Sequence, residues 1–253
     1  KLPLLVAPFL EQKRIAYKLD TVLARVDACR ERLRRVPLIL KRFKQSVLAA
    51  AIAGKLTHDW RVANTVPHVG LDDKTRFNQG ANRDAIYPVV KLSEVSTSRL
   101  GKMLDKTKNS GTFRPYLGNI NVRWFDFEMD NLQEIRVEEK EIAGLALLKG
   151  DVLFCEGGEP GRCAIWDRHD SNIIFQKALH RVRTNCEKLL PQWLAHCIKF
   201  SAETKQLNDL FTVTTIKHLT GVALSKFEIP LPPIEEQHEI VRREDQVQPR
   251  GYP

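Results

Sequence analysis

A regular heptad pattern runs through the first fifty residues. Apolar residues recur at alternating spacings of four and three, at Ile15, Leu19, Val22, Val26, Cys29, Leu33, Val36, Leu40, Phe43, Val47 and Ala50. Such an unbroken series of a and d positions is typical of a helix that packs along a coiled-coil seam. Gly54 predicts the end of the helix, which over residues 10–52 would be about 65 Å long. The helix cannot bury its apolar stripe alone, so we expect a partner helix from this chain or another.

Pro37 falls inside this pattern. A proline in a helix interior removes a backbone hydrogen bond and bends or breaks the helix. Because the heptad phase continues through Pro37, the sequence favours one kinked helix over two unrelated ones. The residues expected to pack against a partner helix, or against a second copy in a homodimer, are Ile15, Leu19, Val22, Val26, Leu33, Leu40, Phe43 and Val47.

The pattern changes twice after this helical region, which we place at residues 1–57. Residues 58–86 are polar and aperiodic and are interpreted as a linker. Residues 87–228 contain short apolar runs separated by turn residues, with two helical stretches, which indicates a globular domain. Strands are predicted at residues 87–92, 116–122, 151–155, 163–167, 173–175 and 180–183, and helices at 191–210 and 216–222. The expected fold class is α+β or mixed α/β, with a long coiled-coil-type helix ahead of the globular domain.

A short motif occurs near both ends of the chain. The run PFLEQKRI at residues 8–15 returns as PIEEQHEI at residues 233–240, and both copies follow an apolar, proline-containing run. The end of the chain thus begins the same helical region that the start of the chain contains in full. This is expected of a fragment cut from a tandem in which a globular domain and a long helix alternate. We take residues 229–243 as the start of a second helical region and the polar residues 244–253 as a tail.

The net charge of the chain indicates a class of binding partner. The net charge is +9 at pH 7, and such an excess favours a polyanion such as double-stranded DNA. Residues 9–59 carry twelve basic and five acidic residues, whereas residues 87–228 carry twenty and eighteen. Within the second region, residues 99–123 hold six basic residues and one acidic residue. The charge is sorted into patches, although ordinary solvated faces explain any single patch equally well.

Cysteine usage and hydropathy restrict the compartment. Five dispersed cysteines without a CxxC pair argue for a reducing cytoplasm and against a disulfide framework. No stretch approaches the roughly 20 consecutive apolar residues of a membrane-spanning helix. The spacing of Cys155, Cys163, His169 and His180 fits no common zinc pattern. We therefore expect a cytoplasmic protein that has no metal, no cofactor and no membrane association.

The glycine-rich run at residues 157–161 (GGEPG) allows several interpretations. A phosphate-binding loop needs a following helix and a lysine in the pattern GxxxxGK[ST], but this run lies between two predicted strands and lacks that pattern. A tight hairpin is the plainest interpretation, and a hairpin tip presented to DNA beside Arg162 is the next. A nucleotide-binding or hydrolytic enzyme built on this loop is the alternative, although no pair of base and nucleophile supports a catalytic site.

Polar and basic positions in the globular domain are candidates for DNA contact. Asn119, Asn121 and Arg123 alternate along a predicted strand, and Asn and Arg make bidentate contacts to adenine and guanine. The loop at residues 98–113 can contact phosphates, and it is equally typical of an ordinary surface loop. A solvated or capping role is the alternative at every position. The candidates are Lys102, Lys106, Lys108, Asn109, Arg114, Asn119, Asn121, Arg123, Gly157, Gly158, Arg162, Gln176, Lys177, Arg181, Thr214, Thr215 and Lys217.

The layout resembles the specificity subunits of type I restriction–modification systems. The run IPLPPIEEQHEIV at residues 229–241 and its degenerate copy at residues 7–20 resemble the family's join between a target-recognition domain and a conserved helix. Residues 40–57 (LKRFKQSVLAAAIAGKLT) are similar to the central conserved region of the family. The resemblance extends to the landmarks of the family's target-recognition domain, which are matched at residues 114–122, 147–166, 175–183 and 215–233.

This resemblance implies a subunit without catalytic activity. Its recognition domain would read one half of a bipartite DNA site. The long helix would set the spacing and dock methyltransferase subunits, and through them the restriction and translocase subunits. Two departures from the family pattern are that the first recognition domain is absent and that the second conserved helix stops after one turn. A coiled-coil scaffold unrelated to DNA is a further hypothesis, but it explains neither the repeated motif nor the charge patches.

Overall fold

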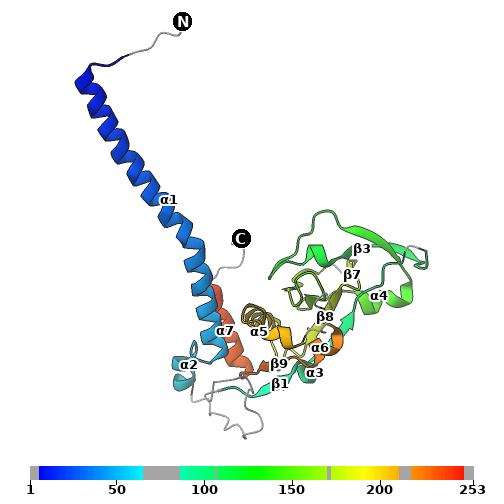
Figure 1. Ribbon diagram of the computed structural model, residues 1–253. Coiled ribbons are helices and arrows are strands. Elements are labelled where there is room, and N and C mark those ends of the chain that lie inside the picture. The colour runs from blue at the N-terminus through cyan, green and yellow to red at the C-terminus, as the bar shows by residue number, and fades with distance from the viewer. Residues whose placement is uncertain (1–5, 65–85, 106, 170–171, 211–217, 248–253) are drawn as a thin grey trace. The chain divides into compact units, whose positions relative to one another are not determined.

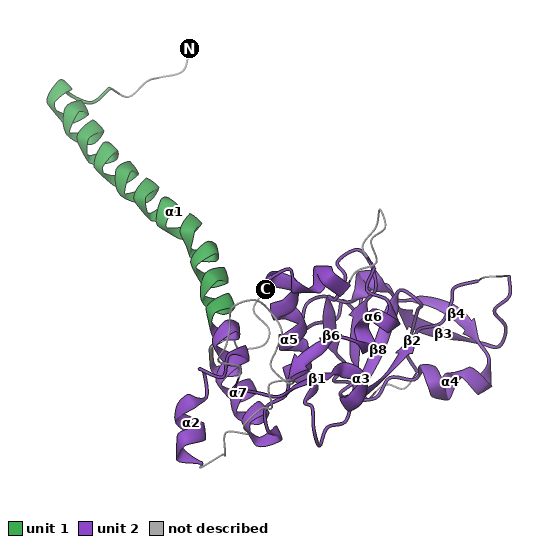
Figure 2. Cartoon of the chain, turned by 60° about the horizontal axis from the view of Figure 1, so that its bottom comes forward, with its two compact units in different colours: residues 1–46 green, residues 47–253 purple. Residues whose placement is uncertain are grey.

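The computed structural model describes residues 6–64, 86–105, 107–169, 172–210 and 218–247 (Figure 1). The chain forms two compact units, Lys1–Ser46 and Val47–Pro253 (Figure 2). No helix within the described ranges is long and apolar enough to cross a membrane.

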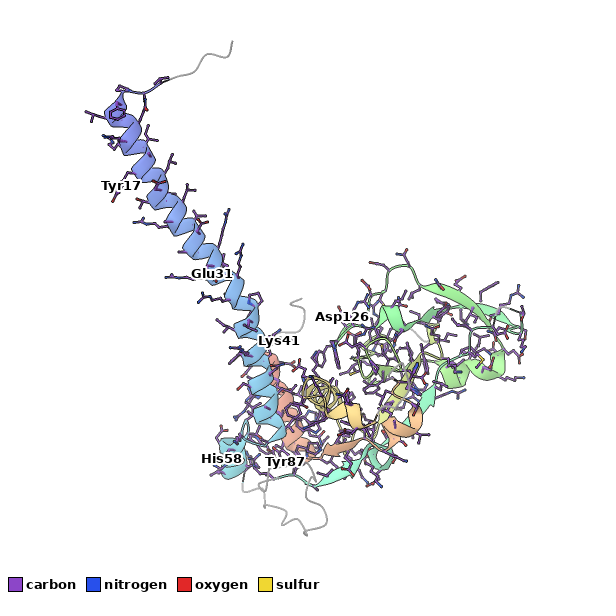
Figure 3. All side chains as sticks on the ribbon, viewed as in Figure 1. Tyr17, Glu31, Lys41, His58, Tyr87 and Asp126 are labelled. Carbon is purple, nitrogen blue, oxygen red and sulfur yellow. The ribbon has the colours of Figure 1, made fainter. Side chains whose placement is uncertain are left out.

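The first unit is the larger part of helix α1 (Phe9–Ile52), which continues without a break through Pro37. The expectation of one helix is therefore confirmed. Along residues 9–46 the side chains project from the helix on all sides (Figure 3), and the apolar stripe is exposed, from 39% at Val26 to 68% at Leu33. After Ile52 the chain turns at Gly54, whose φ of +68° favours glycine. The predicted helix end is thus correct.

The second unit contains three small sheets. A four-stranded antiparallel sheet has the order β2-β8-β5-β6, from β2 (Ser96–Leu100), β8 (Leu179–Thr184), β5 (Val152–Cys155) and β6 (Cys163–Ile165). In a three-stranded sheet, β3 (Thr112–Leu117) pairs antiparallel with β4 (Gln133–Val137) and parallel with β7 (Ile174–Phe175). The third sheet pairs β1 (Val89–Lys91) with β9 (Glu228–Pro230), which brings the two ends of the expected globular domain together.

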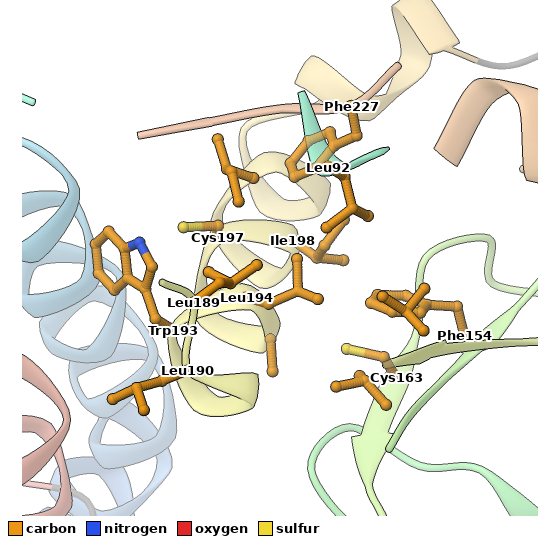
Figure 4. Close-up of a cluster of buried hydrophobic side chains, with 14 of the residues drawn as sticks. Leu92, Phe154, Cys163, Leu189, Leu190, Trp193, Leu194, Cys197, Ile198 and Phe227 are labelled. Carbon is orange, nitrogen blue, oxygen red and sulfur yellow. The ribbon is translucent and has the colours of Figure 1, made fainter. Parts of the chain in front are cut away.

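Two apolar cores lie on either side of strand β5. Val152 and Phe154 belong to the first core, whereas Leu153 and Cys155 belong to the second. Alternate side chains of a strand point to opposite faces, which explains why this strand is apolar throughout. The first core is built around helix α5 (Pro191–Glu203), with Trp193 fully buried (Figure 4).

Short helices complete the second unit. They are α2 (His58–Ala63), α3 (Leu92–Val95), α4 (Glu139–Leu145), α6 (Gly221–Ser225) and α7 (Ile234–Val247), with 3-10 turns η2 (Asn119–Asn121) and η3 (Gln206–Leu210). Helix α7 packs against the end of α1, since Ile240 and Val241 share the first core with Ala51.

The repeated motif has the same local structure in both copies. The Gln237 amide side chain donates to the carbonyl of Pro232 at 2.8 Å, and its backbone N–H donates to Pro233 at 3.0 Å. Gln12 makes the equivalent bonds to Ala7 at 2.7 Å and to Pro8 at 3.0 Å. In each copy the glutamine side chain donates to a carbonyl just before its own helix. Gln237 also donates to the carbonyl of Lys188 and accepts from the N–H of Leu190.

The glutamate of the motif differs between the copies. Glu236 is fully buried and accepts hydrogen bonds from Thr57 at 2.6 Å, from Tyr87 at 2.7 Å and from Arg61, which is itself 6% exposed. We call these four residues the buried lock. It joins helix α2 and the residue just before it, Thr57, to Tyr87 at the start of the globular domain and to Glu236 in α7. Glu11, in the first copy, is 45% exposed, and among the described residues its ion-pair partner is Arg14, at 3.8 Å.

Several predicted boundaries are wrong. The strand expected at residues 116–122 is β3 at Thr112–Leu117, and residues 119–121 form a 3-10 turn. The helix expected at residues 191–210 ends at Glu203, and Lys205 has a φ of +63°. The helix expected at residues 216–222 is α6, at Gly221–Ser225.

The structure also differs from the expected linker and tail, and it contains two strands that were not expected. The expected linker begins with helix α2, and the expected tail begins inside helix α7, where Glu244 is buried. Strands β2 and β4 were not predicted. Their sequences, STSRL and QEIRV, are mostly polar because much of each strand is exposed.

Candidate nucleic-acid interface

Segments far apart in the sequence meet at the turn between β5 and β6. They are residues 118–123, 156–162, 176–178 and 218–219, and we call them the loop cluster. The backbone N–H of Glu156 donates to Ala178 at 3.0 Å, and the N–H of Leu219 donates to Glu156 at 2.8 Å. The cluster brings together eight of the predicted DNA-contact residues, namely Asn119, Asn121, Arg123, Gly157, Gly158, Arg162, Gln176 and Lys177.

The glycine-rich run is the turn of a β-hairpin. Strands β5 and β6 pair antiparallel, with Phe154 opposite Cys163. Gly158 and Gly161 have φ values of +75° and +88°, a region that favours glycine. Strand β6 and not a helix follows the run, which contradicts the phosphate-loop interpretation. The small residues at the tip let another backbone approach closely.

The two asparagines of the 3-10 turn point into the protein. The Asn119 side chain donates to Gly157 at 2.8 Å. The Asn121 side chain is 6% exposed; it accepts from the N–H of Gly118 and donates to the carbonyl of Glu128, both at 2.9 Å. The expectation that Asn119, Asn121 and Arg123 share the polar face of one strand is therefore wrong. Asparagine readily bonds nearby backbone groups, and here that tendency holds a turn.

Three of the predicted basic contacts serve as internal ties. Lys102 forms an ion pair with Glu141 at 2.6 Å. Arg181 donates to the carbonyls of Gly144 and Ala146 at 3.0 and 2.9 Å, and burial lowers the pKa of its guanidinium. Arg162 donates to the carbonyl of Asn119 at 2.9 Å. Their side chains are only 11–17% exposed, because the short loops around them contain carbonyls and carboxylates that need donors.

The remaining candidates lie nearer the surface. Lys108 is 84% exposed, 3.7 Å from Asp105, and Lys177 is also exposed. Arg123 pairs with Glu128. Asn109 donates to the carbonyl of Met103, and Arg114 donates to the side chain of Asn172. Lys106, Thr214, Thr215 and Lys217 lie outside the described residues. DNA contact by all these residues stays a prediction.

The buried histidine of the domain has a structural setting. His180 is 4% exposed, and burial lowers the pKa of its imidazole, against the opposing effect of Glu156. Its ring packs close to Gly221, where a Cβ atom would lie 3.2 Å from Cε1. This setting indicates a role in packing.

Residues 87–248 match the family described as the type I restriction modification DNA specificity domain. The chain belongs to this family. The matched residues begin at the buried Tyr87 and extend through α7, so they include the loop cluster and all three sheets.

Individual relatives agree with this assignment. The specificity subunit of the type I restriction enzyme EcoKI from Escherichia coli K12 is 30% identical over 248 residues, 96% of this chain and 50% of that protein. The EcoBI specificity subunit from Escherichia coli is 34% identical over 245 residues, 95% of this chain and 50% of that protein. The chain thus spans about half the length of the curated relatives it matches.

Solved structures share the fold. The crystal structure of the HsdS subunit from Thermoanaerobacter tengcongensis matches with a TM-score of 0.59 and 20% identity, over 97% of this chain and 52% of that chain. This likeness confirms the expected architecture, in which a long helix accompanies a mixed α/β domain.

Proposed function

We propose that this chain recognises DNA as one half of a type I specificity subunit, with the globular domain reading one part of a bipartite site. The observation that carries the proposal is the family match over residues 87–248. It is supported by the loop cluster, in which hydrogen bonds join a glycine tip to segments that carry the exposed side chains of Ile120 and Lys177. The contribution of the chain is recognition without catalysis, in the cytoplasm of a prokaryotic cell.

Helix α1 sets the distance between recognition domains and docks methyltransferase subunits, through which restriction and translocase subunits join the complex. The length of α1 supports the spacing role, since 44 residues at 1.5 Å each span about 66 Å. The relatives are subunits of type I restriction enzymes, which supports assembly with catalytic partners.

A second copy of the chain covers the apolar stripe of α1. Each Leu, Val or Phe that becomes buried contributes about 1.5–3 kcal/mol, so the exposed stripe favours pairing. Because α7 already packs beside Ala51, the second helix is confined to the stretch before it. An antiparallel register centred between Asp27 and Ala28 places the apolar positions from Ile15 to Leu40 opposite one another, with Ile15 facing Leu40, whereas Phe43 lies opposite Gln12. Two recognition domains related by a two-fold axis would then read an interrupted palindrome.

Sedimentation of matched variants tests the homodimer. Leu33→Glu with Leu40→Glu places two carboxylates in the stripe and is expected to give monomers. Tyr17→Glu with Leu38→Glu makes the same kind of change about half a helical turn away, at side chains that are 77% and 52% exposed, and is expected to leave the dimer intact. A wild type that stays monomeric at tens of micromolar, an order-of-magnitude choice, would refute the pairing.

Selection from a random duplex pool, with methyltransferase subunits present, tests recognition. The expected result is one short motif repeated on opposite strands across a fixed gap. Retention of duplexes without any common motif would contradict DNA recognition, whereas a single unrepeated motif would support recognition and contradict the homodimer.

A further inference from the structure

The side chain best placed to contact a base in the 3-10 turn η2 is the one between the two asparagines. Ile120 is 69% exposed, whereas its neighbours Asn119 and Asn121 turn inward and bond backbone groups. The sequence pattern had suggested the opposite, with the asparagines outward. A single exposed isoleucine is unremarkable on most surfaces, so the inference depends on how this one is held.

The turn carrying Ile120 is fixed from several sides. Asn119 donates to the hairpin at Gly157, and Arg162 donates to the carbonyl of Asn119. A Cβ atom at Gly118 would lie 2.8 Å from Nε2 of Gln176, so the 176–178 segment packs tightly against the turn. A β-branched side chain is also stiff at χ1. Ile120 is therefore presented in a defined position with little conformational entropy left to lose.

The hairpin beside this turn carries little side-chain bulk at its tip. The neighbouring hairpin tip begins with Gly157 and Gly158, which have no side chains to obstruct a close approach. Exposed Lys177 lies in the adjoining segment of the loop cluster and can contact phosphate. Isoleucine has no donor or acceptor, and the apolar group on the major-groove edge of DNA is the 5-methyl group of thymine.

We infer that Ile120 is a specificity-determining residue that contacts the 5-methyl group of one thymine in the recognised sequence. The inference rests on the proposed function, because it needs the loop cluster to face DNA. It adds a named side chain and a named base to that proposal. An apolar contact of this kind also explains why a turn stabilised by so many hydrogen bonds keeps a large apolar side chain in water.

The test replaces each thymine of the duplex selected by the wild type with uracil, which lacks only the 5-methyl group. At one position the wild type is expected to lose about fourfold in affinity, equivalent to ~0.8 kcal/mol for one buried carbon group. Ile120→Ala is expected to bind the thymine duplex at least about fourfold more weakly, by the same reasoning, and to be insensitive to uracil at that position. Ile120→Val should restore most of the sensitivity.

Leu148→Ala is the matched control, because Leu148 is 51% exposed and precedes β5 at the end opposite the hairpin. It should behave like the wild type on every duplex. The inference is overturned if Ile120→Ala keeps the wild-type affinity and uracil sensitivity, or if it weakens all duplexes equally, as loss of an intercalating wedge would. In both cases sequence-selective binding by the wild type leaves the proposed function standing. A wild type without any sequence selection overturns both.

Discussion

Replacing Glu236 by Gln tests whether the buried lock holds the second unit together. The change keeps the shape of the side chain but removes its charge, which leaves the Arg61 guanidinium buried without a counter-ion. Arg61 would still donate to the carbonyl of Gly54 and to the hydroxyl of Tyr87. Those neutral acceptors do not compensate a buried positive charge.

The expected magnitude follows from burial. Removing one partner of a buried ion pair costs about 3–5 kcal/mol. We expect the lower end, about 3 kcal/mol, because the amide oxygen can still accept from Thr57 and Tyr87. For a unit of this size each kcal/mol lowers the Tm by about 2–4 °C. Glu236→Gln should therefore lower the Tm by about 6–12 °C, measured by differential scanning calorimetry.

The matched control lies in the other copy of the motif. Glu11→Gln makes the same substitution at the equivalent position, where the side chain is 45% exposed and lies 3.8 Å from Arg14, so the Tm should not change measurably. Combining Glu236→Gln with Arg61→Met should cost less than the sum of the single changes, because both charges are then gone. Equal melting temperatures for Glu236→Gln and Glu11→Gln would refute the reasoning.

Other predictions concern acid, thiols and salt. Arg243 lowers the pKa of Asp59 from 3.8 to about 2, so this pair stabilises the fold above pH 3.8 and the contribution is lost as the pH falls toward 2; the Tm difference between wild type and Asp59→Asn should close over that range. Two thiols, Cys29 and Cys186, should react quickly with a thiol reagent in the native protein and five in denaturant; fast reaction of more than two would contradict the described burial. If the homodimer forms, the thiol of Cys29 should react more slowly with the reagent at high protein concentration. Affinity for a selected duplex should fall by roughly one log unit of slope per phosphate contact as salt rises, and a flat dependence would argue against DNA binding.

The sequence by itself determined the local features of this protein. The heptad spacing predicted a long helix, Gly54 its end, and the apolar run at β5 a buried strand, because hydrophobic periodicity and turn chemistry act over a few residues. The repeated motif was also visible, and in both copies the glutamine side chain bonds the carbonyl just before its own helix. The resemblance to type I specificity subunits rested on such local runs, and the family match confirmed it.

The tertiary structure decided which of these local features face the interior. Glu11 and Glu236 occupy the same motif position, yet one is exposed and the other is fully buried by Thr57, Arg61 and Tyr87 from other segments. No local pattern distinguishes them, because burial depends on partners that lie far away in the sequence. Asn119 was misassigned for the same reason, because its side chain turns inward to a carbonyl of the distant β5–β6 hairpin. Asn121 turns inward to backbone groups of its own loop, at Gly118 and Glu128.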